Sequence, residues 1–82
     1  MVYYVYILHS NLDGTYYTGS CKNIQARLQM HNAGNVRSTR NRRPWQIVHQ
    51  ETYNSHSEAV RRERQVKSWK KRAAIERLFK KK

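Results

Sequence analysis

The sequence predicts an α/β domain of the α+β type, in which helices flank a three-stranded antiparallel sheet in the order β-β-α-β-α-α. Two short runs rich in aromatic and β-branched residues are separated by Asp13-Gly14, a strong signal for a hairpin turn. Two helix-capping patterns follow, at Asn23 and Ser55, with a third strand-like run between them. A chain of 82 residues has the length of one domain, so we expect residues 1–82 to form a single unit.

The expected strands are defined by their composition and by the residues that flank them. Val2–His9 is rich in tyrosine and aliphatic residues, as a buried strand is. Thr15–Ser20 follows the Asp-Gly turn and should therefore run antiparallel to the first strand. Trp45–Tyr53 forms the third strand. The segment Asn35–Pro44 before it contains four arginines and few apolar residues, so we expect an exposed loop there.

The expected helices begin at residues that can cap free backbone N–H groups. Asn23 is a favourable N-cap, and Gly34 is a typical residue at a helix C-terminus. Ser55-His56-Ser57-Glu58 has the S-x-x-E form of a capping box and opens a helix that continues to about Trp69. A second helical segment, Lys70–Phe79, follows, and Lys80–Lys82 is expected to be a frayed basic tail.

The net charge of +12 is concentrated in the second part of the chain. Residues 1–36 carry Lys22 and Arg27 against Asp13, a net charge of +1, whereas residues 37–82 carry 15 basic residues against four glutamates, a net charge of +11. Such an asymmetric basic domain is typical of proteins that bind a polyanion, with nucleic acid favoured. A charge that serves solubility, or a surface for acidic membranes, remains the alternative.

The basic residues that we expect to bind nucleic acid share an exposed setting in the arginine-rich loop and along the later helices. Arginines interleaved with serine, threonine and asparagine make good phosphate contacts but carry no base code. We therefore expect binding that tolerates many sequences and weakens steeply with salt. The residues are Lys22, Arg37, Arg40, Arg42, Arg43, Arg62, Lys67, Lys70 and Lys71.

The single cysteine, Cys21, excludes an intrachain disulfide and a zinc site built from several thiolates. A cytoplasmic location is the expectation for such a chain. No apolar run approaches the roughly 20 residues of a membrane span, so we expect no membrane partner. Trp45 and Trp69 are expected either to anchor the core or to stack on unpaired bases.

Glu63 lies on the apolar stripe of its helix, between Ala59 and Val66. A carboxylate at such a position needs a partner, because burying an unpaired charge is very costly. A salt bridge to one of the many arginines would satisfy it, and so would a metal ion. The residues alone leave both alternatives open.

Two further groups of residues stand out in the first part of the chain. Arg27 and His31 are one helical turn apart and should project together, which is also what an ordinary boundary pair does. Tyr17 and Gly19 share one face of their strand, and a glycine in a strand often marks close approach by another group. Tyr6 should lie near Tyr17 across the hairpin, although strand tyrosines are usually core residues.

Together these residues resemble the GIY-YIG endonuclease domain, and in particular its small stand-alone bacterial members. Tyr4-Val5-Tyr6 and Tyr17-Thr18-Gly19 look like the paired tripeptides of that family, with the hairpin turn between them. Arg27, His31 and Glu63 match the helix arginine, the histidine one turn later and the metal-binding glutamate. The resemblance covers nearly the whole chain. It departs from the family pattern at Tyr4 and Thr18, and at Ser20, where many relatives have a lysine. Lys22 is the nearest basic residue in the sequence.

The resemblance implies hydrolysis of phosphodiester bonds in nucleic acid, with DNA favoured over RNA. It implies that Glu63 holds one divalent ion, Mg²⁺ or Mn²⁺, and that Arg27 clamps the phosphate. Tyr17 would orient or deprotonate the attacking water, with Tyr6 in support, and His31 would relay a proton or hold its neighbours. A tyrosine with an ordinary pKa near ~10 is a poor base at neutral pH, so its phenolate would need stabilising cations.

Two other functions remain open at this level. A nucleic-acid-binding module could keep the fold without catalysis, which Ser20 favours because it removes one positive charge from the expected phosphate site. An RNA-associated structural protein would also fit the charge and the size, but it would leave the coincidence of five matching residues without a cause. Because the domain is so small, we also consider that a protein partner directs it to its substrate.

Overall fold

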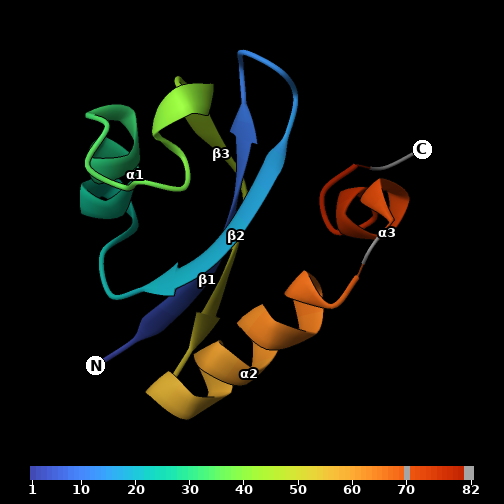
Figure 1. Ribbon diagram of the computed structural model, residues 1–82. Coiled ribbons are helices and arrows are strands. Elements are labelled where there is room, and N and C mark those ends of the chain that lie inside the picture. Colours follow the sequence, from blue (N-terminus) through green and yellow to red (C-terminus); the bar gives the residue numbers. More distant parts are fainter. Residues whose placement is uncertain (70, 81–82) are drawn as a thin grey trace.

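The computed structural model of the chain describes residues 1–69 and 71–80. The order of elements agrees with the prediction, with one additional 3-10 helix (Figure 1). Lys70 and most of the expected tail Lys80–Lys82 lie outside the described residues. The elements are β1 (Tyr3–Ser10), β2 (Tyr16–Cys21), α1 (Ile24–Asn32), η1 (Arg40–Arg42), β3 (Trp45–Tyr53), α2 (His56–Lys67) and α3 (Arg72–Glu76).

The sheet has the strand order β2-β1-β3, and both pairs of strands are antiparallel. β1 is therefore the central strand, which explains why Val5, Tyr6, Ile7 and Leu8 are almost fully buried. In the β1–β2 register Tyr6 lies opposite Gly19, and Leu8 lies opposite Tyr17. β2 forms one edge of the sheet, so residues on both of its faces can be approached from the same side of the molecule.

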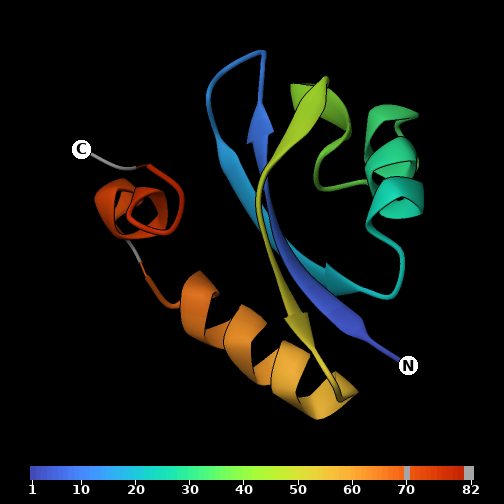
Figure 2. The same ribbon diagram turned by 180° about the vertical axis from the view of Figure 1, so that it is seen from behind.

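Helices cover both faces of the sheet. α1 lies on one face, and α2 and α3 lie on the other, as the two opposite views show (Figures 1 and 2). On the α1 face, Tyr6, Leu8 and Trp45 form the core together with Ile24. Alternation along β1 sends Val5 and Ile7 to the α2 face. None of the helices in the described ranges is long and apolar enough to cross a membrane.

The local signals act as the sequence indicates. Gly14 in the hairpin and Gly34 after α1 both adopt positive φ, at +77° and +84°. The Asn23 side chain accepts a hydrogen bond from Ala26 N, and the Ser55 side chain accepts one from Glu58 N. These two caps fix where α1 and α2 begin, and therefore the positions of the side chains one and two turns later.

The C-terminal helix is shorter than expected. The sequence predicts a helical segment over Lys70–Phe79, whereas α3 spans Arg72–Glu76. The backbone N–H groups of Leu78 and Phe79 bond to carbonyls three residues earlier, so the chain tightens into turns after α3. Phe79 then packs against Tyr16, with ring centroids 5.6 Å apart, which holds this end of the chain to the sheet.

Candidate active site

Tyr6, His31 and Thr39 form a buried chain of hydrogen bonds. Thr39 Oγ1 donates to the carbonyl of Val36 at 3.3 Å and lies 2.7 Å from His31 Nδ1. Because the Thr39 proton is used in this way, His31 Nδ1 is the donor to Thr39, and the Nε2 of the neutral ring accepts from Tyr6 Oη at 3.2 Å. Burial, and secondly the charge of Arg27, lower the pKa of His31, which favours this neutral form.

The same burial determines the state of Tyr6. Its side chain is 2% exposed, and desolvation raises its pKa to about 12, although the Arg27 guanidinium pulls in the opposite direction. Gly19 allows the ring to lie there: a Cβ atom at that position would be 2.5 Å from Tyr6 Oη. The close approach that a glycine in β2 suggested is therefore made by Tyr6. Tyr6 and His31 are both removed from solvent, so they are suited to holding neighbouring groups in place.

Tyr17 is the more accessible of the two tyrosines. Its ring packs edge-on against His31, with centroids 5.0 Å apart, and against Trp45 at 6.4 Å. The ammonium of Lys67 lies 5.8 Å from the ring centroid. Trp45 is almost fully buried and donates its Nε1 proton to the Thr39 carbonyl, so it acts as a core anchor beneath Tyr17.

Arg27 supplies a positive charge that no carboxylate neutralises among the described residues. Its Nε is buried and has no hydrogen-bond partner of good geometry in that part of the chain. Its Nη1 lies 4.0 Å from the thioether of Met30, and the guanidinium acts on the Tyr6 hydroxyl as a hydrogen-bond donor that opposes the rise of that pKa. The charge of Arg27 acts on Tyr6, His31 and Glu63. A half-buried guanidinium without an anion is an unsatisfied donor, which is what a phosphate-binding arginine requires.

Glu63 lies against β2 and not in solvent. Its Oε1 accepts a hydrogen bond of 2.6 Å from Ser20 Oγ, and its Oε2 lies 2.7 Å from Lys67 Nζ. Burial alone would raise the pKa of Glu63, but the bonds from Lys67 and Ser20 outweigh it and hold the pKa below its ordinary value. The carboxylate is therefore ionised at neutral pH.

Four of the five predicted site residues fall into two groups on opposite faces of the sheet, and the fifth, Arg27, acts on both groups through its charge. Tyr6, Tyr17 and His31 are in contact on the α1 face of the sheet. Glu63 approaches β2 from the α2 face. Lys67 bridges Glu63 and Tyr17, and Arg27 acts electrostatically on both groups. The arrangement therefore wraps around the edge strand β2 and presents a carboxylate, a phenol and two cations.

Some of the residues expected to bind nucleic acid are already paired with carboxylates, and others are not. Arg62 forms a bidentate pair with Glu51, through Nε at 2.9 Å and Nη2 at 3.1 Å, and it stacks on Trp69. Arg62 therefore stabilises the fold, and its guanidinium is not free to bind a phosphate. Arg42 pairs with Asp13 at 3.2 Å in an exposed contact. Lys70 lies outside the described residues. The other expected residues are exposed: Lys22, Arg37, Arg40, Arg43 and Lys71.

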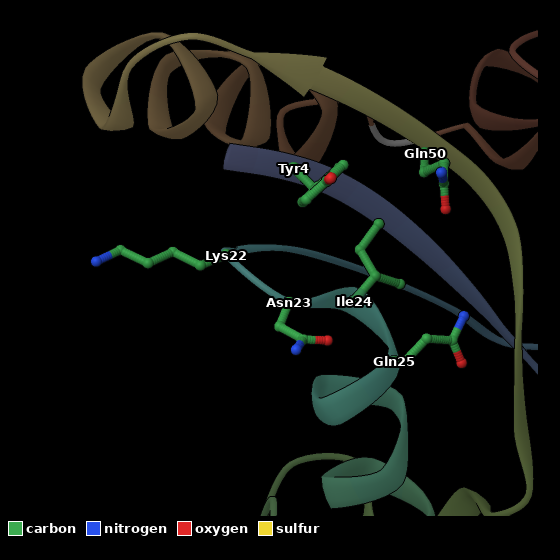
Figure 3. A pocket seen from close by; sticks show the side chains of 6 residues that line it. All are labelled: Tyr4, Lys22, Asn23, Ile24, Gln25 and Gln50. Carbon is green, nitrogen blue, oxygen red and sulfur yellow. The ribbon is translucent and has the colours of Figure 1, made fainter. Parts of the chain in front are cut away.

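A hollow of about 360 Å³ lies beside this site, between the start of α1, β1 and β3 (Figure 3). Its walls carry an aromatic ring, a lysine and amide groups, and none of the five predicted site residues lines it. The Lys22 ammonium lies 5.7 Å from the Tyr3 ring centroid. Lys67, and not Lys22, therefore brings a lysine charge to Glu63 and Tyr17. The lining residues are Tyr4, Lys22, Asn23, Ile24, Gln25 and Gln50.

Three contributors to the site are not evident as such in the sequence. Lys67 is expected there only as part of a general basic surface, although its spacing of four from Glu63 is a signal for a helical ion pair. In the sequence Ser20 is notable only because many relatives have a lysine there. In the structure its hydroxyl donates a hydrogen bond to Glu63. Thr39 carries no signal, because only the three-dimensional path of the arginine-rich loop brings it to His31.

A family model for the GIY-YIG catalytic domain matches residues 2–78. The chain belongs to the GIY-YIG family. GIY-YIG domains are in general nuclease domains, which act on nucleic acid. The match spans every strand and helix described above, including the hairpin tyrosines, Arg27 and Glu63.

Similar proteins carry the UPF0213 name. UPF0213 protein SERP0126 of Staphylococcus epidermidis is 44% identical over 68 residues, which covers 82% of each chain. UPF0213 protein VNG_2274C of Halobacterium salinarum is 43% identical over 79 residues, 95% of this chain and 100% of that one. The solution NMR structure of UPF0213 protein BH0048 from Bacillus halodurans is similar with a TM-score of 0.60 and 37% identity, covering 95% of this chain and 82% of that chain. The GIY-YIG fold is thus shared by small proteins of this kind.

Proposed function

We propose that this GIY-YIG domain is a divalent-metal-dependent nuclease that hydrolyses phosphodiester bonds, with DNA favoured over RNA. The observation that carries the proposal is the state of Arg27. Its guanidinium is half-buried and without a carboxylate partner among the described residues, and its charge acts on Tyr6, His31 and the ionised Glu63. A phosphate between these groups would supply the anion that Arg27 lacks, and its planar fork can hold two phosphate oxygens.

The donor set at Glu63 fits one hard divalent cation. An ionised, largely buried carboxylate is a favourable oxygen ligand for Mg²⁺ or Mn²⁺. Within residues 1–69 and 71–80 no group of three His, Cys, Asp or Glu side chains could form a complete protein cage, so water and phosphate oxygens would complete the coordination. When bound, such an ion supplies polarisation of the phosphoryl group and stabilisation of the leaving oxygen.

The protein side chains divide the remaining work. Arg27 would bind and orient the phosphate. Tyr17 would orient the attacking water, with the Lys67 ammonium 5.8 Å from the centroid of its ring. Tyr6 and His31 are positioning residues in this scheme, because their buried hydrogen bond fixes the ring of His31 against Tyr17.

A purified-protein cleavage assay tests this proposal. We expect the wild type to cut supercoiled or branched DNA in the presence of Mg²⁺ or Mn²⁺. Glu63→Gln and Arg27→Ala should each lower the rate by at least about 100-fold, as the loss of one stabilising group does at many active sites. Glu58→Gln, on the same helix, and Arg77→Ala, directly after α3, are matched in charge and should retain activity. Equal rates for Glu63→Gln and Glu58→Gln would refute the mechanism.

A non-catalytic nucleic-acid-binding module is the second candidate. The ion pair between Lys67 and Glu63 favours it, because an ammonium already neutralises the carboxylate. In that case the wild type should bind DNA and leave it intact with either metal. Supercoiled plasmid that stays uncut under conditions of measured binding would select this function.

A further inference from the structure

Both carboxylate oxygens of Glu63 have partners in the protein itself. Ser20 Oγ occupies one at 2.6 Å and Lys67 Nζ the other at 2.7 Å. The Glu63 side chain is 19% exposed, whereas that of Lys67 is 49% exposed. The carboxylate is thus held in place, and its cation sits at the end of a long side chain with room to move. A divalent ion that binds the same carboxylate would therefore compete with this ammonium.

The Lys67 ammonium also faces the other half of the site. It lies 5.8 Å from the centroid of the Tyr17 ring, so the same ammonium lies close to both the Glu63 carboxylate and the Tyr17 ring. Ser20 contributes a hydroxyl where a lysine would add a positive charge. Lys67 therefore brings that charge to the edge of β2 from α2.

We propose that Lys67 is an exchangeable cation, which neutralises Glu63 in the free protein and turns to the substrate phosphate when a divalent ion binds Glu63. This inference rests on the proposed nuclease function. A divalent ion and an ammonium repel each other at one carboxylate, so each weakens the binding of the other. The flexible, half-exposed stem of Lys67 allows the ammonium to move, and a phosphate bound at Arg27 offers it a new partner. Metal and nucleic acid would then bind with positive coupling.

The exchange predicts that removing the Lys67 charge strengthens metal binding in the absence of nucleic acid. Mn²⁺ alone is the probe, and the free ion is measured by electron paramagnetic resonance during titration. Lys67→Met, which keeps an unbranched stem, should bind Mn²⁺ about tenfold more tightly than the wild type, within the usual range of coupling between sites. Lys67→Arg, which keeps a cation, should stay as weak as the wild type.

Two control variants locate the effect. Arg77→Met removes the same charge from the exposed residue that follows α3, and it should change Mn²⁺ affinity less than about twofold, because an exposed charge outside the site is screened by solvent and salt. Glu63→Gln combined with Lys67→Met should lose the gain, since the carboxylate is then absent. The exchange is overturned if Lys67→Met binds Mn²⁺ no more tightly than Arg77→Met does.

The second half of the inference concerns the phosphate. At saturating Mn²⁺, Lys67→Met should cut DNA more slowly than the wild type despite its tighter metal binding, because a positive charge that faces the reacting phosphate is lost. A faster variant would exclude a phosphate role for Lys67. If no protein cuts DNA while Lys67→Met still gains Mn²⁺ affinity, the nuclease function fails and the competition at Glu63 stands. If the wild type cuts DNA and Lys67→Met gains no Mn²⁺ affinity, the nuclease function stands and the competition at Glu63 fails.

Discussion

Single side chains in this protein are held in defined protonation states by burial. The hydrogen bond from Tyr6 to His31 requires a neutral phenol and a neutral imidazole. Desolvation favours both, since it raises the pKa of Tyr6 to about 12 and lowers that of His31. At neutral pH Tyr6 therefore stays protonated and His31 stays uncharged. Tyr17 is the more solvent-accessible phenol of the two.

The neutral state of His31 makes stability depend on pH in one direction. Below the ordinary histidine pKa of about 6.5, the unfolded chain binds a proton that the folded chain resists. The free energy of unfolding should therefore fall as the pH drops from 7 to 5. His31→Gln should weaken this dependence, whereas the exposed His56→Gln should preserve it. Urea unfolding followed by tryptophan fluorescence at pH 7, 6 and 5 measures the difference, and parallel pH profiles for wild type and His31→Gln would contradict it.

The chemistry of single residues was partly predictable from the sequence. The sequence pattern indicated that Glu63 needs a partner, and the family resemblance indicated its companions Tyr17 and Arg27. The identity of the partner was not predictable in the same way, because Ser20 reaches Glu63 only after β2 and α2 have packed. The burial of His31 likewise depends on Thr39, which comes from a loop whose path has no local sequence signal.

At the scale of elements, the caps were the most informative sequence features. Asn23 and Ser55 mark the starts of α1 and α2 because each side chain bonds a backbone N–H three residues later. The ends were less predictable, since they depend on what the last turn meets. α2 stops at Lys67 and not near Trp69, and α3 gives way to tight turns where Phe79 packs on the sheet.

The cap of α2 can be tested separately from the active site. Ser55→Ala removes the side-chain acceptor for Glu58 N and should lower the free energy of unfolding by about 1 kcal/mol. Ser57→Ala makes the same chemical change inside the first turn of α2, where alanine is favourable for a helix, and should cost little. Thermal or urea unfolding of the two variants provides the comparison. A loss from Ser57→Ala as large as that from Ser55→Ala would show that the Ser55 bond contributes little.

At the scale of the molecule, positive charge is divided between structural and free cations. Arg62 and Arg72 are tied to Glu51 and Glu76, so they support the fold. The arginines of the loop before β3 are exposed, and among the described residues no carboxylate pairs with Arg37 or Arg40. The charge excess that the sequence places after residue 36 therefore overstates the number of cations that are free to bind an anion, since composition does not show which cations are already paired.

This division leads to a prediction about salt. Without divalent metal, the affinity for a DNA duplex should fall on a double-logarithmic plot against salt, with a slope of about 0.9 for each neutralised phosphate. Replacing Arg37 and Arg40 with alanine should lower the slope by about 2 and weaken binding equally for all sequences. Arg62→Ala should leave the slope unchanged and reduce stability, because it leaves Glu51 without its bidentate partner. Fluorescence anisotropy between about 50 and 200 mM salt distinguishes them; a slope altered by Arg62→Ala but not by the loop variant would place the nucleic acid on α2.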